Sequence, residues 1–101
     1  MTKPTIRQIQ NAVCNHFRIG RRDMLSESRM RHLVDPRHIA IALSRKIGGR
    51  SYPMIGREFG RDHSSIINAC QRIEARIDAG SSSTIEAMAE IEAALGREAR
   101  I

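Results

Sequence analysis

The sequence is poor in aromatic residues and contains no long apolar segment. With no tryptophan, one tyrosine and two phenylalanines, its core must be built from aliphatic side chains and methionine. No stretch approaches the roughly 18 apolar residues of a membrane span, and the N-terminus lacks the apolar run of a signal peptide. We therefore expect a cytoplasmic protein without a membrane partner.

Cysteine and phosphate-binding glycine motifs are also scarce. Cys14 and Cys70 are the only cysteines, and neither has metal-ligand or C-x-x-C spacing, so no zinc site or disulfide framework is expected. No lysine-containing phosphate loop occurs, and Gly48-Gly49 is typical of a helix end. As a general base His63 would need an acidic or nucleophilic partner, and the capping Asp62 is the one residue spaced to supply it. We expect no metal, no cofactor, no bound nucleotide and no enzymatic activity.

Positive charge is abundant and unevenly distributed. Seventeen basic residues, of which 15 are arginine, face 11 acidic residues, and the net charge is +6. Residues 1–50 hold 11 basic and 3 acidic residues, whereas residues 51–101 hold 6 and 8. Clustered guanidinium groups favour a polyanionic partner such as nucleic acid. Taken alone, the charge is equally explained by genomic base composition and solubility.

We expect residues 1–101 to form a single domain. Its first half shows two helical patterns. A helix is predicted over residues 5–17, opened by a capping box of Thr5 and Gln8. Residues 19–34 read as a basic loop with about one helical turn. Asp35-Pro36 then predicts a new helix start, with Asp35 as the cap, and Gly48-Gly49 predicts its end.

The second half predicts a helix-turn-helix at about residues 52–77 and a last helix. Ser51 caps a short helix that ends at Phe59, and Asp62 caps a longer one with a buried stripe to Ile77. A capping box of Ser83 and Glu86 predicts the start of a helix at about residues 84–100. That helix is acidic, so it should not face DNA. Its predicted apolar stripe consists of Ile85, Met88, Ile91 and Leu95.

Short polar side chains stand at the start of the second helix of the motif. A helix N-terminus offers free N–H groups to phosphates, and its first side chains reach base edges in the major groove. The simpler interpretation is that Asp62 and Ser65 only cap the helix, and that Arg29, Arg31 and Arg37 only form a solvated surface. The predicted major-groove residues are Asp62, His63, Ser64 and Ser65.

Three segments carry a family resemblance. Residues 36–40 (PRHIA), 51–65 (SYPMIGREFGRDHSS) and 69–74 (ACQRIE) strongly resemble the C-terminal DNA-binding domain of the bacterial replication initiator DnaA. This resemblance implies an all-α fold, a small helical bundle containing a helix-turn-helix of the TrpR-like/DnaA C-terminal type. It also implies binding to double-stranded DNA at short asymmetric sites, the DnaA boxes.

The resemblance assigns roles by matching position. Asp62, His63 and Ser64 match major-groove base readers, and Ser65 matches a phosphate or base contact beside them. Arg29 matches an arginine inserted in the minor groove, where narrow A·T-rich DNA attracts guanidinium. The residues predicted to contact the DNA backbone or minor groove are Arg29, Arg31, Arg37, His38 and Arg61.

The chain departs from the family pattern in four ways that concern the target sequence, two of which are Glu27-Ser28 in a loop that is commonly more positive and Asp35 before the proline. It has one glycine fewer between Phe59 and Arg61, and Ser64-Ser65 replaces the usual pair of threonines, which removes methyl groups that can pack on thymine. These 101 residues hold no counterpart of the initiator's ATP-binding motor domain, so we expect no ATP-driven unwinding from them alone. We expect sequence-specific DNA binding near the nucleoid that regulates transcription or replication initiation. The alternative is an interaction module that docks a protein partner through its last helix.

Overall fold

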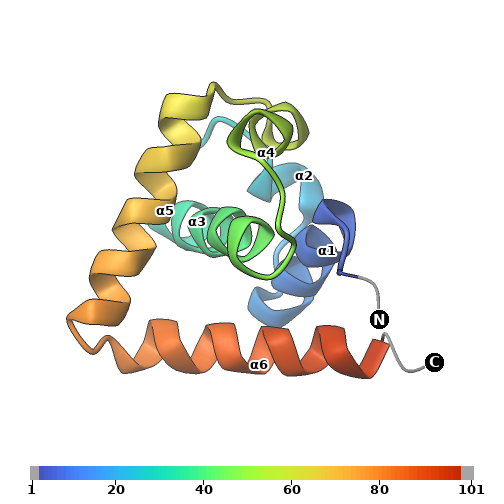
Figure 1. The fold of residues 1–101 in the computed structure, drawn as a ribbon, viewed down its shortest axis with the longest axis vertical. Helices are drawn as coiled ribbons and strands as arrows, with labels where there is room; N and C mark the ends of the chain where they lie inside the picture. The colour runs from blue at the N-terminus through green and yellow to red at the C-terminus, as the bar shows by residue number, and fades with distance from the viewer. Residues whose placement is uncertain (1–2, 99–101) are drawn as a thin grey trace.

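The computed structural model describes residues 3–98, which form six helices and no strand (Figure 1). This confirms the predicted all-α fold. In chain order the helices are α1 (Ile6–Phe17), α2 (Arg21–Met24), α3 (Arg31–Lys46), α4 (Tyr52–Phe59), α5 (His63–Asp78) and α6 (Ser82–Glu98).

The central helix α3 packs against each of the other five helices. Its buried residues Ile39, Ile41 and Leu43 meet aliphatic side chains from α1 and α5, including Ile9 and Ile73. The core is aliphatic apart from Phe59, as the scarcity of aromatic residues requires. A central helix covered on all sides gives α4 and α5 a fixed support.

Local capping signals set three of the helix starts as predicted. The Thr5 hydroxyl accepts from the backbone N–H of Gln8 at 3.1 Å, and the Gln8 side chain accepts from the Thr5 N–H at 2.8 Å. The Ser51 hydroxyl caps α4, and the Asp62 carboxylate caps α5. These side chains satisfy N–H groups that the first helical turn leaves free.

The predicted start of the third helix was wrong. Helix α3 begins at Arg31, with Met30 as its N-cap residue, and Pro36 lies inside it. Asp35 does not cap. Its carboxylate lies 3.7 Å from Arg31 one turn earlier and 3.0 Å from Arg76 of α5. These ion pairs, together with burial of Leu33, hold the first turn despite the N–H that proline lacks.

The start of the last helix also differs from the prediction. Helix α6 begins at Ser82, so Ser83 lies within the first turn and does not form a capping box with Glu86. Met88, Ile91 and Leu95 are buried as predicted, but Ile85 is 42% exposed and Thr84 is buried in its place. The predicted end at Arg100 lies outside the described residues.

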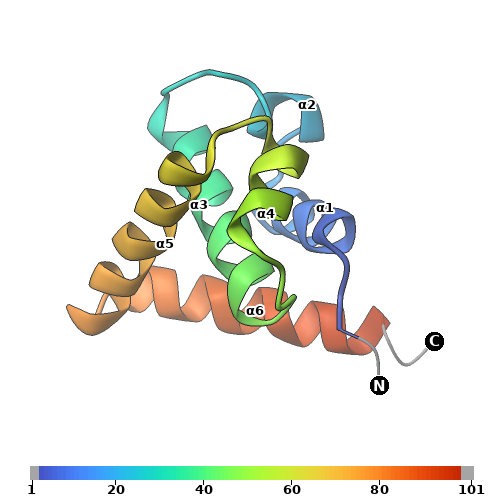
Figure 2. The same ribbon diagram turned by 45° about the horizontal axis from the view of Figure 1, so that its top comes forward.

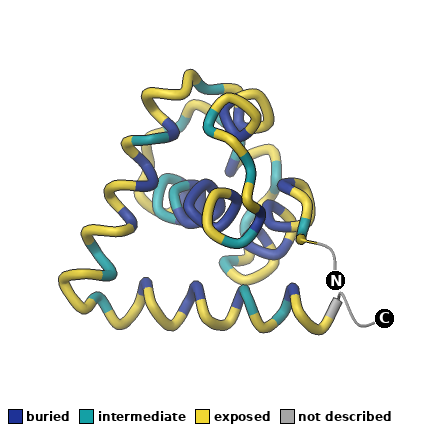
Figure 3. Tube along the Cα trace, in the orientation of Figure 1, coloured by how far each residue is buried: buried dark blue, intermediate teal, exposed yellow. Residues whose placement is uncertain are grey.

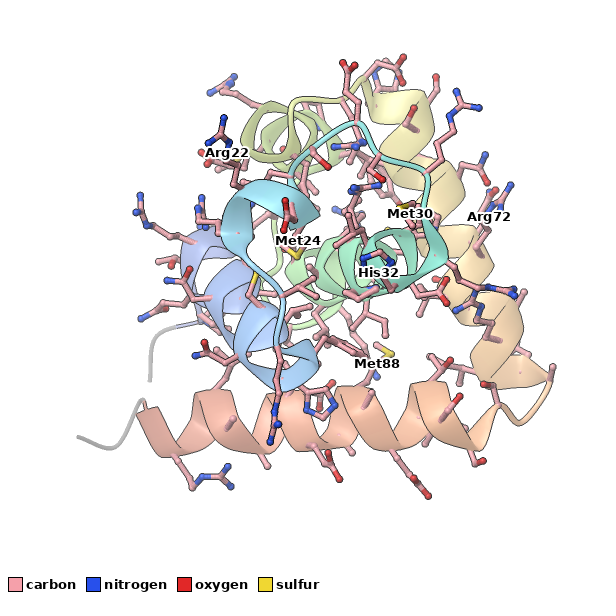
Figure 4. The ribbon with its side chains drawn as sticks, turned by 180° about the vertical axis from the view of Figure 1, so that it is seen from behind. Arg22, Met24, Met30, His32, Arg72 and Met88 are labelled. Atoms are coloured by element: carbon pink, nitrogen blue, oxygen red, sulfur yellow. The ribbon has the colours of Figure 1, made fainter. Side chains whose placement is uncertain are left out.

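Helix α6 runs along one side of the bundle and contacts α1, α3 and α5 (Figure 1). Its buried positions face the bundle and its exposed positions face away, as the tube in Figure 3 shows. Met88 projects from α6 into the bundle (Figure 4). Among the described residues, no helix combines the length and the apolar character that crossing a bilayer requires.

Candidate nucleic-acid interface

The turn between α4 and α5 is shaped by two glycines. A Cβ atom on Gly56 would lie 2.5 Å from the backbone carbonyl oxygen of Arg61, so only glycine allows this close approach. The Arg61 N–H donates to the Gly56 carbonyl at 2.9 Å. Gly60 ends α4 in the left-handed conformation with φ of 65°. The turn therefore fixes how α5 leaves α4.

The first turn of α5 presents four polar side chains to solvent. Asp62, His63, Ser64 and Ser65 are all exposed. The Asp62 carboxylate accepts from the Ser65 backbone N–H at 2.9 Å. That hydrogen bond and a second one from the Ser65 hydroxyl lower the pKa of Asp62. Asp62 therefore caps the helix and remains anionic at neutral pH at an exposed position.

A groove of about 760 Å³ lies beside this helix start. We call it the basic groove. Its walls are the loop between α2 and α3 at residues 27–29, one side of α3 at residues 34–41, the turn at residues 60–61 and one face of α5. Its basic lining residues are Arg29, Arg37, His38, Arg61 and Arg72. Glu27 is the single carboxylate among its lining residues.

The loop and the start of α5 lie on the same side of the molecule, with α6 along the opposite side (Figure 2). The acidic helix thus lies away from the basic groove, and the prediction that it does not face DNA stays a prediction. Its acids also serve the fold, because Glu90 lies 3.6 Å from His16 and Glu92 lies 3.9 Å from Lys46. Outward-facing Ile85 is the apolar residue that a protein partner would meet there.

Two of the predicted basic residues are free to reach outward. Arg29 is exposed in the loop, and the side chain of Arg31 is 86% exposed at the start of α3. The Arg31 guanidinium lies near Asp35, which is itself paired with Arg76. An exposed pair of this kind is weak and does not prevent Arg31 from meeting a phosphate.

Arg37 and Arg61 are placed differently. Arg37 is only 4% exposed, and its Nε and Nη1 groups donate to the carbonyls of Met24 and Ser28. Arg61 donates to the carbonyls of Phe59 and Ser26. Burial, together with the charge of Arg61, lowers the pKa of Arg37. A direct DNA contact by these two arginines stays a prediction, and their visible partners are backbone carbonyls.

His38 lines the floor of the basic groove and is half-buried. Burial lowers its pKa, and the positive charges of Arg72 and Arg37 lower it further. At neutral pH His38 is therefore an uncharged imidazole. It can donate one hydrogen bond to a phosphate oxygen and accept another.

Two groove residues on α5 were missed by the sequence reasoning. Asn68 and Arg72 line the groove on the same helix face as Ser65, and the Arg72 Nε donates to the Asn68 side chain at 3.3 Å. Arg72 projects outward from α5 in Figure 4, in which Met30 marks the end of the loop. Asn68 follows Ser65 by three residues and Arg72 follows Asn68 by four, and this helical spacing was the signal that would have found them.

The two cysteines lie in the core. Cys14 and Cys70 are buried free thiols, and burial raises the pKa of each. Such thiols behave as small apolar side chains. Within residues 3–98, no three side chains of histidine, cysteine, aspartate or glutamate gather as a metal site would require.

Comparison with known proteins places this geometry in a family. The sequence pattern described as "Bacterial dnaA protein helix-turn-helix" matches residues 6–73. The chain is 50% identical over 72 residues to the chromosomal replication initiator protein DnaA of Sphingopyxis alaskensis, which covers 70% of this chain and 16% of that protein. It is 43% identical over 75 residues to the protein of the same name from Rhizobium meliloti, covering 73% and 16%.

A third relative gives the same picture. The chromosomal replication initiator protein DnaA of Citrifermentans bemidjiense is 45% identical over 74 residues, covering 72% of this chain and 16% of that protein. The matches therefore span about a sixth of each relative's length. The matched region contains α1 to α4 and most of α5, and so includes every element that lines the basic groove.

Proposed function

Because the chain belongs to the bacterial DnaA helix-turn-helix family, we propose that it is a sequence-specific double-stranded-DNA-binding protein. The observation that carries the proposal is the basic groove. It brings the exposed start of α5 and the arginine-bearing loop to one side of the molecule. A helix for the major groove and a basic loop for the neighbouring minor groove are the two contacts that such a reader needs.

The start of α5 supplies the base contacts. His63 and Ser64 are exposed in the first turn, where side chains of a recognition helix reach base edges. The Asp62 carboxylate can accept from the amino group of cytosine while it caps the helix. Ser65 lies at the groove edge and donates to a phosphate or base. Helix N–H groups and the helix dipole favour the phosphate at this point.

The basic residues supply backbone and minor-groove contacts. Arg29 enters the minor groove from the loop, and Arg31 meets the adjacent phosphates. His38 and Arg72 line the basic groove of the protein. In the proposed complex they face the DNA strand between the major groove and the minor groove. Each phosphate neutralised by arginine releases counterions, so the affinity should fall steeply with salt. The function proposed is binding without catalysis.

The biological role proposed is regulation at DnaA boxes in the cytoplasm, either of transcription or of replication initiation. The relatives are named chromosomal replication initiator proteins. A chain that presents the same reading surface would compete with such an initiator for its sites. Competition alone is enough to regulate initiation, because it needs no ATP-driven step from this domain.

The test is fluorescence anisotropy at near-physiological salt with a DnaA-box duplex and a scrambled duplex. The wild-type chain should bind the box duplex more tightly by at least about a hundredfold, which is modest for specific recognition. His63→Ala should lose most of this preference. Gln71→Ala is the matched control, since Gln71 is exposed on the same helix and does not line the groove.

Equal, weak binding to both duplexes would contradict sequence-specific recognition of the box. Absence of DNA binding at low salt would instead favour the interaction module, with α6 as its docking helix. Pull-down with wild-type chain and with Ile85→Ser, which alters the exposed apolar residue of α6, would then follow.

A further inference from the structure

The loop between α2 and α3 is held by two arginines from different parts of the fold. Arg37 of α3 donates to the Met24 carbonyl at 2.6 Å and to the Ser28 carbonyl at 3.0 Å. Arg61, from the turn before α5, donates to the Ser26 carbonyl at 2.7 Å. The last carbonyl of α2 and two carbonyls of the loop are thus fixed by charged donors, and the last of the three, that of Ser28, immediately precedes Arg29.

Leu25 packs the start of the loop against the core, and the other side-chain hydrogen bonds of the loop are local. Within the loop, the Ser26 hydroxyl donates to the Asp23 carbonyl, and the hydroxyls of Ser26 and Ser28 each accept one backbone N–H. These local bonds shape short turns but do not connect the loop to the helix-turn-helix. Arg61 does connect them, because its backbone forms the turn and its guanidinium reaches the loop.

The charges in this arrangement are unusual. Within the described residues, neither Arg37 nor Arg61 has a carboxylate at ion-pair distance, and the two guanidiniums repel each other. The Nη2 atom of Arg37 is buried and has no hydrogen-bond partner. Arg37 is buried and Arg61 is half-buried, and a buried guanidinium without a carboxylate is unfavourable unless its hydrogen bonds compensate. Apolar side chains of similar volume would stabilise the fold at least as well. A contribution to folding stability alone therefore does not explain why arginine occupies these two positions.

We infer that Arg37 and Arg61 are positioning residues that aim Arg29 at the minor groove and fix its distance from the recognition helix α5. This inference rests on the proposed function. Arg61 is the residue directly before the Asp62 cap, so a single side chain links the path of the loop to the start of α5. Binding in the minor groove and binding in the major groove then depend on one shared turn.

The experiment asks whether Arg37 and Arg61 position Arg29 or contact DNA themselves. It uses a duplex in which only the minor-groove edge of one base pair is changed. In a second box duplex, adenine is replaced by diaminopurine at the A·T step facing Arg29. This base adds an amino group to the minor-groove edge and leaves the major-groove edge unchanged. The wild-type chain should bind this duplex about tenfold more weakly, as expected for one unfavourable base pair. Arg29→Ala should remove the difference.

The main variant is Arg61→Lys, which keeps the charge but cannot reach the Phe59 and Ser26 carbonyls together. We expect it to reduce the diaminopurine effect to less than about threefold while the salt dependence of binding stays as in the wild type. Added to Arg29→Ala, it should cause no further loss of affinity. Arg37→Lys should behave alike, provided thermal unfolding shows that it folds.

Arg72→Ala is the matched comparison for a groove arginine that contacts phosphate. It should weaken binding to both duplexes equally and reduce the salt slope by about one. A further variant, Arg61→Ala, removes the charge as well as the contacts with Phe59 and Ser26. If it gives the same result as Arg72→Ala and its effect adds to that of Arg29→Ala, Arg61 contacts DNA directly and the positioning role is wrong. If the wild-type chain does not prefer the box duplex at all, the proposed function has failed, which is a separate result.

Discussion

The basic-groove side and the α6 side of the molecule are held in place by different interactions. Helix α6 is attached mainly by buried apolar residues, with exposed ion pairs at its edge. The loop at the groove is attached by hydrogen bonds from two arginines to backbone carbonyls. The hydrophobic effect has no preferred direction, whereas a hydrogen bond is strong only over a narrow range of distances and angles. The part that we propose to contact DNA is the part held by directional contacts.

The largest expected effect is a loss of folding stability caused by a substitution on the α6 side alone. Ile91→Ala should lower the free energy of unfolding by about 2–5 kcal/mol, because Ile91 is 1% exposed and its removal leaves a cavity. Chemical denaturation followed by circular dichroism measures this. The affinity of the folded fraction for DNA should be unchanged, and Ala93→Ser, at an exposed position of the same helix, is the control. A loss of specificity would show that the two sides are coupled.

A change at the turn should affect stability and binding together. Gly56→Ala should lower the free energy of unfolding by about 1–3 kcal/mol, since its Cβ would lie 2.5 Å from a backbone carbonyl that cannot move freely. The displaced turn should also misdirect α5, so the preference for the box duplex should fall. Gly96→Ala, in α6 with nothing near its Cβ, is the control and should be neutral or stabilising.

A third prediction sharpens the contrast between exposed charges on the two sides. Arg72→Ala should weaken DNA binding several-fold and reduce its salt slope by about one, with little change in stability. Lys46→Ala should leave binding unchanged, because Lys46 lies at the α6 side opposite Glu92. Its exposed ion pair should contribute less than about 1 kcal/mol. Equal effects of the two variants on binding would contradict the position given to the interface.

The smallest effect is a pH dependence at the groove. The pKa of His38 is lowered from 6.5 in the folded state, by burial and by nearby arginines. The unfolded chain therefore takes up the proton more readily, and stability should fall as pH decreases through 6.5. The measurement is the free energy of unfolding of the wild type and of His38→Gln from about pH 8 to about pH 5.5, a range that spans the ordinary pKa of histidine. His32→Gln, at an exposed position, should keep the wild-type pH dependence.

Helix starts show how far local sequence reasoning reaches. Thr5, Ser51 and Asp62 cap their helices as predicted, because each cap is a bond between residues three apart in the chain. Asp35-Pro36 has the same local signature and is not a helix start. There a long-range partner, Arg76 of α5, takes the carboxylate that local reasoning assigned to capping.

The candidate site divides in the same way. The exposed residues at the start of α5 follow from the cap and the helical repeat, and the sequence motif supplied their predicted role. Asn68 and Arg72 follow from helix spacing and were overlooked. The placing of Arg37 was not predictable, because a guanidinium facing solvent and one buried against carbonyls have the same sequence signal.

The sequence by itself determined the helical class, most helix boundaries, the motif and the family, since these depend on contacts over a few residues and on patterns along the chain. The tertiary structure alone decided which arginines are presented to solvent and which hold the loop. That choice depends on backbone carbonyls of Met24, Ser26 and Ser28 meeting side chains up to 35 residues away in sequence. Carbonyls are present in every residue, so no residue pattern marks the ones that will be bound.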